Sequence, residues 1–320
     1  MVRRVARYII IALLAVAAGV CAWAWTPDLP RAGLESRYAS PPSRFVEVEG
    51  VRLHLRDTGP RADAPSDGGQ SRTAVLLLHG FGSSLHTWED WAGHLQDSRR
   101  VVRLDLPGFG LTGPDPSADY SDARAVVILT ALLDRLGLAQ ADVIGSSMGG
   151  RIAWRFAAER PERVRRLVLM APDGFASEGR PYGEAAELPL AMRLLPYTLP
   201  MPLLRPGLAA AYADPAALRE DVLQRYRDML LAPGVRTAIL DRVRTAILER
   251  PEPFLHRIAV PVLLLWGEQD RMVPAAHAAD YARDLPDSRT VVLPGIGHVP
   301  MEERPQEALA ALVSFLDGER

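Results

Sequence analysis

The sequence predicts an α/β fold in which one mostly parallel sheet carries helices on both faces. Short, continuous apolar runs recur along the chain, and amphipathic stretches of helical period separate them. Such runs are typical of strands buried on both faces, and their alternation with helices favours parallel neighbours. The chain has 320 residues, of which 48% are hydrophobic and 24% charged, so it can bury a large core.

Each element follows from these patterns in chain order. Apolar residues alternate from Phe45 to Arg56 around Glu49-Gly50, which predicts a β-hairpin. The polar residues 60–72 are expected to form a loop. Buried strands are expected at 74–80, 101–108, 142–147, 166–172, 261–267 and 290–295. Amphipathic helices are expected at 121–136, 149–164, 275–285 and 306–317.

One interval breaks this alternation. Residues 176–256 show no strand pattern and are rich in Leu, Pro, Ala and Met, which predicts a helical cap, or lid, inserted into the core. The core then comprises residues 44–175 and 257–320. The cap contains a tandem repeat, VRTAILDR at 235–242 and VRTAILER at 243–250. We interpret this repeat as a local duplication within one amphipathic helix.

The N-terminal segment predicts a membrane anchor. Three arginines within residues 1–7 precede an uncharged apolar run at 8–25. As a helix, the uncharged stretch spans roughly 30 Å, about the hydrocarbon thickness of a bilayer. The arginines predict that residues 1–7 are cytoplasmic and that the rest of the chain lies across the membrane.

Two other interpretations of this segment stay open. It can be a signal peptide cleaved near Ala22-Trp23-Ala24, or a lipoprotein signal that ends at Cys21. Residues 26–43 contain four prolines and are expected to form a juxtamembrane linker. The small residues Ala18 and Gly19 leave a homodimer through the apolar helix open.

Composition excludes several kinds of chemistry. The formal net charge is -2, so the chain has no overall basic field for nucleic acid. All 37 basic residues are arginines, which excludes Schiff-base and Walker-type chemistry because both need lysine. The single cysteine can form neither an internal disulfide nor a zinc cluster. We expect no cofactor, no metal and no nucleic-acid partner.

The sharpest motif is a G-x-S-x-G pentapeptide formed by Gly145, Ser146, Ser147, Met148 and Gly149. It lies between an expected strand and an expected helix, where it is typical of a tight turn that strains the backbone of the serine. Glycines are needed two residues to either side because side chains there would collide. Ser147 is therefore the candidate nucleophile.

A serine nucleophile needs a base and an acid that orients the base. Among the seven histidines, His298 follows a late strand in a Gly-rich loop, which favours it as the base. Asp270 ends the strand and turn PVLLLWGEQD and is the expected acid. Asp173 and Glu268 remain alternatives for that role.

A tetrahedral oxyanion needs two backbone N–H donors held in place. Met148 should supply one and Phe81, in the loop HGFG, the other. His79 in the same loop is expected to brace it, whereas His54 and His94 are expected to be partly exposed.

The motifs HGFG, DLPGFG, GSSMGG, WGEQD and GIGH occur in this order, and from about residue 44 to 320 the chain resembles the α/β-hydrolase superfamily. The resemblance implies an eight-stranded mostly parallel sheet, a helical lid and a triad of Ser147, Asp270 and His298. With its N-terminal helix the chain further resembles membrane-anchored bacterial carboxylesterases, some of which are phospholipases A. This second resemblance implies a single-pass protein of the bacterial inner membrane with a periplasmic catalytic domain.

These features predict a membrane-anchored serine hydrolase that cleaves carboxylic esters through an acyl-enzyme. The expected substrates are acyl lipids, as for a phospholipase A, a lysophospholipase or a monoacylglycerol lipase. The Leu-rich residues 188–210 suit a long acyl chain. Three alternatives remain: a carboxylesterase of small soluble esters, a C–C bond hydrolase, which in related enzymes carries Asn at the position of Ser146, and a catalytically silent binding protein.

Overall fold

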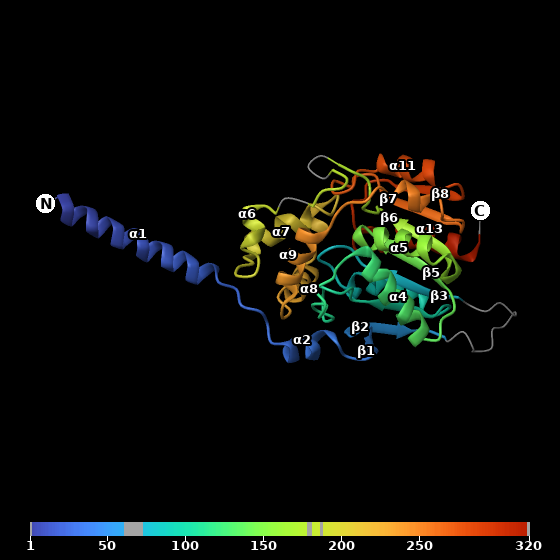
Figure 1. Ribbon diagram of the computed structural model, residues 1–320, viewed down its shortest axis with the longest axis horizontal. Coiled ribbons are helices and arrows are strands. Elements are labelled where there is room, and N and C mark those ends of the chain that lie inside the picture. Colours follow the sequence, from blue (N-terminus) through green and yellow to red (C-terminus); the bar gives the residue numbers. More distant parts are fainter. Residues whose placement is uncertain (1, 61–72, 178–180, 186–187, 319–320) are drawn as a thin grey trace.

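The computed structural model describes residues 2–60, 73–177, 181–185 and 188–318. Nearly all of the loop expected at 60–72 therefore lies outside the described residues. Figure 1 shows the helix α1 (Val2–Ala24) projecting from a body in which helices lie on both sides of a central sheet.

The described residues form an eight-stranded sheet with the order β1-β2-β4-β3-β5-β6-β7-β8. Strand β2 pairs antiparallel with β1 and with β4, and all the other pairs are parallel. The predicted eight-stranded, mostly parallel sheet is thus confirmed. The strands are β1 (Ser43–Val48), β2 (Val51–Thr58), β3 (Ala74–Leu78), β4 (Val101–Leu104), β5 (Ala141–Ser146), β6 (Val164–Met170), β7 (Val262–Gly267) and β8 (Ser288–Leu293).

The central strands are buried because apolar layers cover both faces of the sheet. On β3, Leu76 and Leu78 belong to one apolar cluster, whereas Val75 and Leu77 belong to another on the opposite face. All four side chains are fully buried. A strand enclosed in this way must be apolar throughout, which is the pattern that predicted it.

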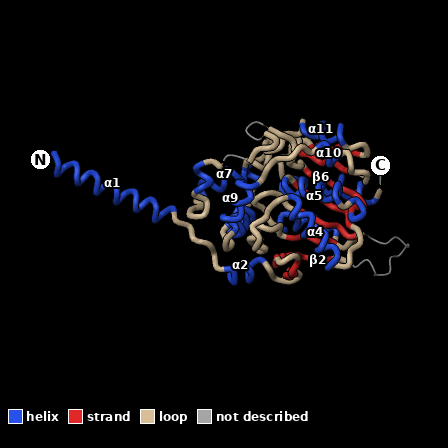
Figure 2. The backbone as a smooth tube through the Cα atoms, viewed as in Figure 1, coloured by secondary structure: helices blue, strands red, loops and turns tan. Residues whose placement is uncertain are grey.

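Figure 2 shows helices flanking the strands, and helices occur at the predicted amphipathic stretches. They include α4 (Asp122–Arg135), α5 (Met148–Glu159), α11 (His277–Asp284) and α13 (Pro305–Asp317). Helix α5 ends at Glu159 rather than at 164, because Pro161 disfavours helical backbone at Arg160, whose φ and ψ are -135° and 57°. The short helix α3 (Glu89–Leu95) contains His94, which the sequence placed on a helix, whereas the short helix α12 (Pro300–Glu303) was not predicted.

Between β6 and β7, in the interval where the sequence predicts a cap, the described residues form helices. They are α6 (Leu190–Arg193), α7 (Met201–Ala209), α8 (Glu220–Leu230), α9 (Val235–Thr245) and α10 (Glu252–Leu255). The prediction of one helix across the tandem repeat is wrong. Helix α9 ends at Thr245, Ala246 has extended backbone, and Ile247 pairs with Ala185 in an isolated bridge.

The segment expected as a linker is folded against the rest of the molecule. It contains α2 (Arg31–Tyr38), in which Leu34 is buried. Arg37 forms an ion pair of 2.7 Å with Asp228 on α8, and the backbone N–H of Leu29 donates to the carbonyl of Leu231. These contacts connect residues about 190 to 200 positions apart in sequence, so local pattern could not reveal them.

In the described part of the chain, one helix is long and apolar enough to cross a membrane. This stretch, Arg3–Ala24, contains an 18-residue window with a mean hydropathy of 2.3, and its described side chains are exposed except that of Ala24, which is half-buried. A signal sequence near an N-terminus has the same length and composition.

Candidate active site

Ser147 lies in a sharp turn between β5 and α5, where its φ is 54° and its ψ is -119°. Two close backbone approaches make this turn possible only with glycine. A Cβ on Gly145 would overlap the carbonyl oxygen of Gly149, and a Cβ on Gly149 would overlap that of Leu78. The strained serine conformation expected from the motif is therefore present.

His298 and Asp270 lie together in the loops that follow β8 and β7. The Nδ1 atom of His298 is 2.7 Å from Oδ2 of Asp270. The other carboxylate oxygen accepts hydrogen bonds from the backbone N–H groups of Met272 and Val273, at 2.8 and 2.9 Å. An ionised Asp270 therefore keeps the imidazole proton on Nδ1 and leaves the lone pair on Nε2.

The two alternative acids have other partners. Oδ2 of Asp173 lies 3.6 Å from Nε of Arg151. Glu268 is exposed, and its side chain accepts from the backbone N–H of Gly295 at 3.1 Å. The geometry thus joins His298 to Asp270.

The loop after β3 lies against the nucleophile. A Cβ on Gly80 would come within 3.3 Å of the Cβ of Ser147, so only glycine allows this approach without displacement. His79 braces the loop, as expected: its Nδ1 donates to the carbonyl of Gly80 at 2.7 Å, and its Nε2 accepts from the N–H of Leu106 at 2.9 Å. Burial lowers the pKa of His79, which favours the neutral ring that these bonds require.

Both candidate oxyanion donors border the cavity that contains Ser147. Met148 is the first residue of α5, so its N–H has no carbonyl partner inside the helix. Phe81 is 46% exposed, and its ring contacts that of Phe109 at 5.5 Å between centroids.

Ser147 and His298 line one cavity of about 300 Å³. Its apolar walls come from Met148, Pro172, Phe175, Val243, Ala246, Met272, Val273 and Pro274. No described residue of 188–210 lines it, so the expectation that these leucines hold an acyl chain is not supported here. Leu190 and Leu203 instead face solvent, each 75% exposed, and Leu204 and Leu208 pack in a small cluster with α8.

The cavity also has polar lining that sequence reasoning missed. Arg151, Arg242, His277 and Tyr281 all border it together with Asp173. Arg242 ends the first copy of the tandem repeat, and this repeat is the one sequence feature that could have drawn attention to it. Nothing in the local sequence marks Tyr281, which folding brings in from α11.

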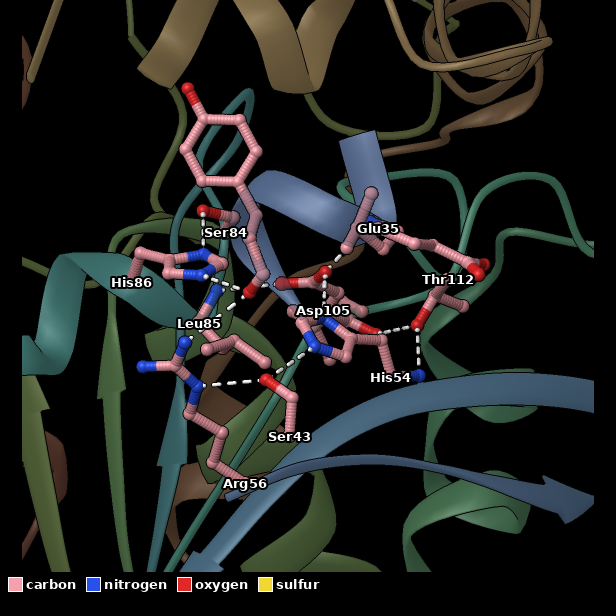
Figure 3. Close-up of polar contacts among 12 residues, drawn as sticks. Glu35, Ser43, His54, Arg56, Ser84, Leu85, His86, Asp105 and Thr112 are labelled. Atoms are coloured by element: carbon pink, nitrogen blue, oxygen red, sulfur yellow. Dashed lines mark hydrogen bonds and ion pairs between the residues drawn. The ribbon is translucent and has the colours of Figure 1, made fainter. Parts of the chain in front are cut away.

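His54 is fully buried, so the expectation that it is partly exposed is wrong. Figure 3 shows it between Ser43 and Asp105: Nε2 lies 3.0 Å from Oγ of Ser43, and Nδ1 lies 2.8 Å from Oδ2 of Asp105. The carboxylate also accepts from the backbone N–H groups of Leu85 and Leu111. Burial alone would raise the pKa of Asp105, but the charge and hydrogen bond of His54 outweigh it and hold the pKa below its ordinary value.

This second serine, histidine and aspartate array is separate from the active-site cavity, since none of the three residues lines it. It ties β1 and β2 to the loop after β4, and we interpret it as structural. Among the described residues, no group of three or more His, Cys, Asp or Glu side chains is arranged to hold a metal ion.

A mostly parallel sheet that presents a serine at a strained strand-to-helix turn, close to a histidine and aspartate pair, defines the class of α/β hydrolases. The family model for the alpha/beta hydrolase fold matches residues 73–305. The chain belongs to this family and is a hydrolase.

Individual relatives are similar over most of the chain. It is 31% identical over 253 residues to the dihydrolipoyllysine-residue acetyltransferase component of the acetoin cleaving system of Pseudomonas putida, an alignment that covers 78% of this chain but only 65% of that protein. A meta-cleavage product hydrolase from Pseudomonas fluorescens IP01 superposes with a TM-score of 0.73 at 22% identity, over 87% of this chain and 98% of the other. A membrane phospholipase A, described as a bacterial virulence factor, superposes with a TM-score of 0.70 at 27% identity, over 98% of this chain and 99% of the other.

Proposed function

We propose that this protein is a membrane-anchored serine hydrolase that cleaves the carboxylic esters of acyl lipids through an acyl-enzyme. The observation that carries the proposal is the common cavity of Ser147 and His298, with Asp270 bonded to the histidine. This is the arrangement that converts a weakly nucleophilic hydroxyl into an attacking group.

In the first half of the reaction, the Oγ of Ser147 attacks the ester carbonyl carbon while Nε2 of His298 takes the hydroxyl proton. Asp270 holds the imidazole in the required tautomer and stabilises the imidazolium that forms. The backbone N–H groups of Phe81 and Met148 donate to the carbonyl oxygen as it becomes negative. The C–O bond then breaks, and the alcohol leaves with the proton from His298.

In the second half, His298 removes a proton from water, and the hydroxide attacks the acyl carbon. The bond to Ser147 breaks, the serine recovers its proton, and the free acid leaves. The protein contributes the nucleophile, the base and the fixed donors, so no cofactor is required by these steps.

Two observations favour a lipid ester. The similarity to a membrane phospholipase A extends over 98% of this chain, whereas that to the meta-cleavage hydrolase covers 87%. Helix α1 is uncharged and mostly apolar from Tyr8 onward and projects from the body, which suits a bilayer environment.

The end of α1 is bonded directly to the cap. The N–H of Thr26 donates to the carbonyl of Tyr197 at 2.9 Å, and Oγ1 of Thr198 donates to the carbonyl of Ala24 at 2.6 Å. Figure 1 shows α6 and α7 as the part of the body nearest to α1. An anchored α1 would therefore hold the cap side of the domain close to the lipid surface. The three arginines in the first turns of α1 favour a cytoplasmic N-terminus, and we propose that the domain lies on the periplasmic side of an inner membrane.

An active-site probe tests the catalytic assignment. Full-length protein in membranes is treated with a fluorophosphonate, and the labelled peptide is mapped by mass spectrometry. We expect modification of Ser147, none in Ser147→Ala protein, and full labelling of Ser43→Ala protein, which lacks the serine of the second array. Labelling of Ser43, or none on folded protein, contradicts the proposal.

A further inference from the structure

The buried residue Arg242 lines the active-site cavity, and the proposed mechanism does not use its guanidinium. This residue lies on α9, is 5% exposed, and lines the same cavity as Ser147 and His298. Removal of a charge from water is strongly unfavourable unless other groups compensate it. The unfavourable free energy of burying this cation must therefore be offset by groups of the protein or by a ligand.

Arg242 is held by carbonyl groups and aromatic rings. Its Nη1 donates to the carbonyl of Tyr120 and its Nη2 to that of Pro107, each at 3.0 Å. The guanidinium carbon lies 5.3 Å from the ring centroids of Phe109 and Tyr120. Its Nε is buried and has no hydrogen-bond partner within the described ranges of the chain. Since a guanidinium has five N–H donors, these two bonds leave others for a ligand.

The neighbouring buried arginine is compensated differently. Nη1 of Arg151 lies 2.9 Å from a carboxylate oxygen of Asp122, and its Nε lies 3.6 Å from one of Asp173. In the part of the chain that the structure describes, no carboxylate forms such an ion pair with Arg242. Burial, followed by the repulsion of Arg151, lowers the pKa of Arg242 to about 10, although the charges of Asp122 and Asp119 and the hydroxyl of Tyr120 oppose this shift. Arg242 is thus still a cation at neutral pH, and the carboxylates of Asp122 and Asp119 act on it without forming an ion pair among the described residues.

We propose that Arg242 binds an anionic group of the substrate, a carboxylate or a phosphate carried close to the scissile ester. The inference rests on the proposed function and narrows its substrate class to anionic esters. The planar fork of a guanidinium matches two oxygens of either anion. The carbonyls of Pro107 and Tyr120 fix that fork before the substrate arrives, so little side-chain freedom is lost on binding.

The tandem repeat supplies a matched control. Arg242 ends the copy VRTAILDR, and Arg250 ends the copy VRTAILER. The side chain of Arg250 is 68% exposed, and this residue does not line the cavity. The two positions therefore share a local sequence but differ in access to the substrate.

Two esters of the same shape test the inference. One is the p-nitrophenyl half-ester of glutarate, and the other carries an isopropyl group in place of the free carboxylate. We expect full-length protein to prefer the half-ester in kcat/KM by about 10- to 100-fold, the range for a hydrogen bond between charged groups. Arg242→Gln should abolish most of this preference, Arg242→Lys should keep part of it, and Arg250→Gln should keep all of it.

The ratio of the two rates separates recognition from a structural role. If Arg242 only clamps α9 to the core, its loss lowers both rates alike and leaves the ratio unchanged, which overturns the inference. Two further outcomes overturn the inference if a pair of lipid esters gives the same result. One is a preference for the half-ester that survives in Arg242→Gln protein, and the other is no preference in full-length protein.

A pair of lipid esters tests whether the recognised anion lies on the alcohol side or the acyl side of the ester bond. Oleoyl lysophosphatidate and monooleoylglycerol differ by a phosphate on the alcohol side, whereas the half-ester carries its anion on the acyl side. A preference that depends on Arg242 in one pair alone supports the inference and identifies which source of the anion the cavity accepts.

A binding measurement keeps this test independent of turnover. Both p-nitrophenyl esters are titrated into Ser147→Ala protein, with and without Arg242→Gln, by calorimetry. Tighter binding of the half-ester that depends on Arg242, together with no hydrolysis by the unmutated enzyme, would refute the proposed function and retain this inference. Equal binding of both esters by Ser147→Ala protein would refute the acyl-side form of the inference whatever the rates.

Discussion

The imidazole of His298 is bonded through Nδ1 to Oδ2 of Asp270 at 2.7 Å, and both side chains are buried. The backbone N–H of His298 also donates to the carbonyl of Ala211 in the cap, at 2.7 Å. The cap and the loop after β7 therefore both fix the position of the histidine relative to Ser147.

Loss of the carboxylate should remove the required tautomer of His298. We expect Asp270→Asn to lower kcat by about 10⁴-fold, as in the best-studied serine triad, with little loss of folded protein. Asp173→Asn is the comparison, since Asp173 lines the same cavity but pairs with Arg151. Steady-state kinetics on a soluble ester decide between them: a greater loss in Asp173→Asn than in Asp270→Asn protein would move the acid to Asp173.

The sharp turn at Ser147 should tolerate no side chain at Gly149. A Cβ there would overlap the carbonyl of Leu78, so Gly149→Ala must displace either β3 or the start of α5. We expect loss of activity and a lower melting temperature. Gly93→Ala is the control, because a Cβ at that helical position meets nothing within 4 Å, and it should leave both quantities unchanged or slightly raise the melting temperature. Equal activity and equal melting temperature in the two variants would contradict the close packing at the turn around Ser147.

His86 should make stability depend on pH. Burial is the main cause that lowers its pKa from 6.5 to about 4, with Arg56, Arg225 and His54 adding to the effect and Asp105 opposing it. Between these two pH values the unfolded chain binds a proton that the folded chain does not. Stability is therefore fully present above pH 6.5 and is lost as the pH falls toward 4, by up to about 3 kcal/mol.

The two polar contacts of His86 suit a neutral imidazole ring. Its Nε2 lies 3.1 Å from the carbonyl of Tyr38 at the end of α2, and its Nδ1 lies 3.3 Å from the hydroxyl of Ser84, as Figure 3 shows for Ser84. Chemical denaturation at a series of pH values should give a shallower slope for His86→Gln than for the unmutated protein. The exposed His94, replaced in the same way, should leave the slope as it was. An unchanged slope in His86→Gln protein would refute the assignment.

The folded state of residues 26–43 can be tested by substitution. Leu34 on α2 is 3% exposed within the main apolar cluster. Its replacement by alanine should lower the free energy of unfolding by about 2–4 kcal/mol, through lost burial and a residual cavity. Leu203→Ala, at a position that is 75% exposed, should change it by less than about 0.5 kcal/mol. If the two variants are equally stable, this segment behaves as the linker that the sequence suggested.

The sequence was sufficient for elements whose pattern is local. The strands of the parallel sheet are continuous apolar runs because both faces are covered, and the turn at Ser147 needs glycines at fixed offsets. Asp270 and His298 could be chosen because the carboxyl ends of parallel strands meet at one edge of the sheet. Their bond is a consequence of that topology.

The features that could not be predicted from the sequence depend on contacts between distant segments. His54 was assigned to an exposed face because β2 alternates, but β2 lies between β1 and β4, and Asp105 closes over it. Helix α2 was missed because its flanking prolines suggested a linker, whereas Arg37 and Asp228 fix it across the fold. Arg242 differs in burial from Arg250 although their local sequences match, so no local rule could separate them.

The release of fatty acid from phospholipid vesicles tests the central claim most directly. Full-length protein is reconstituted in the vesicles, and free fatty acid is measured by mass spectrometry, with Ser147→Ala protein as the blank. We predict release well above this blank, together with hydrolysis of soluble short-chain esters. Release equal to the blank, from protein that still cleaves short-chain esters, would contradict a lipid substrate and leave a tethered carboxylesterase.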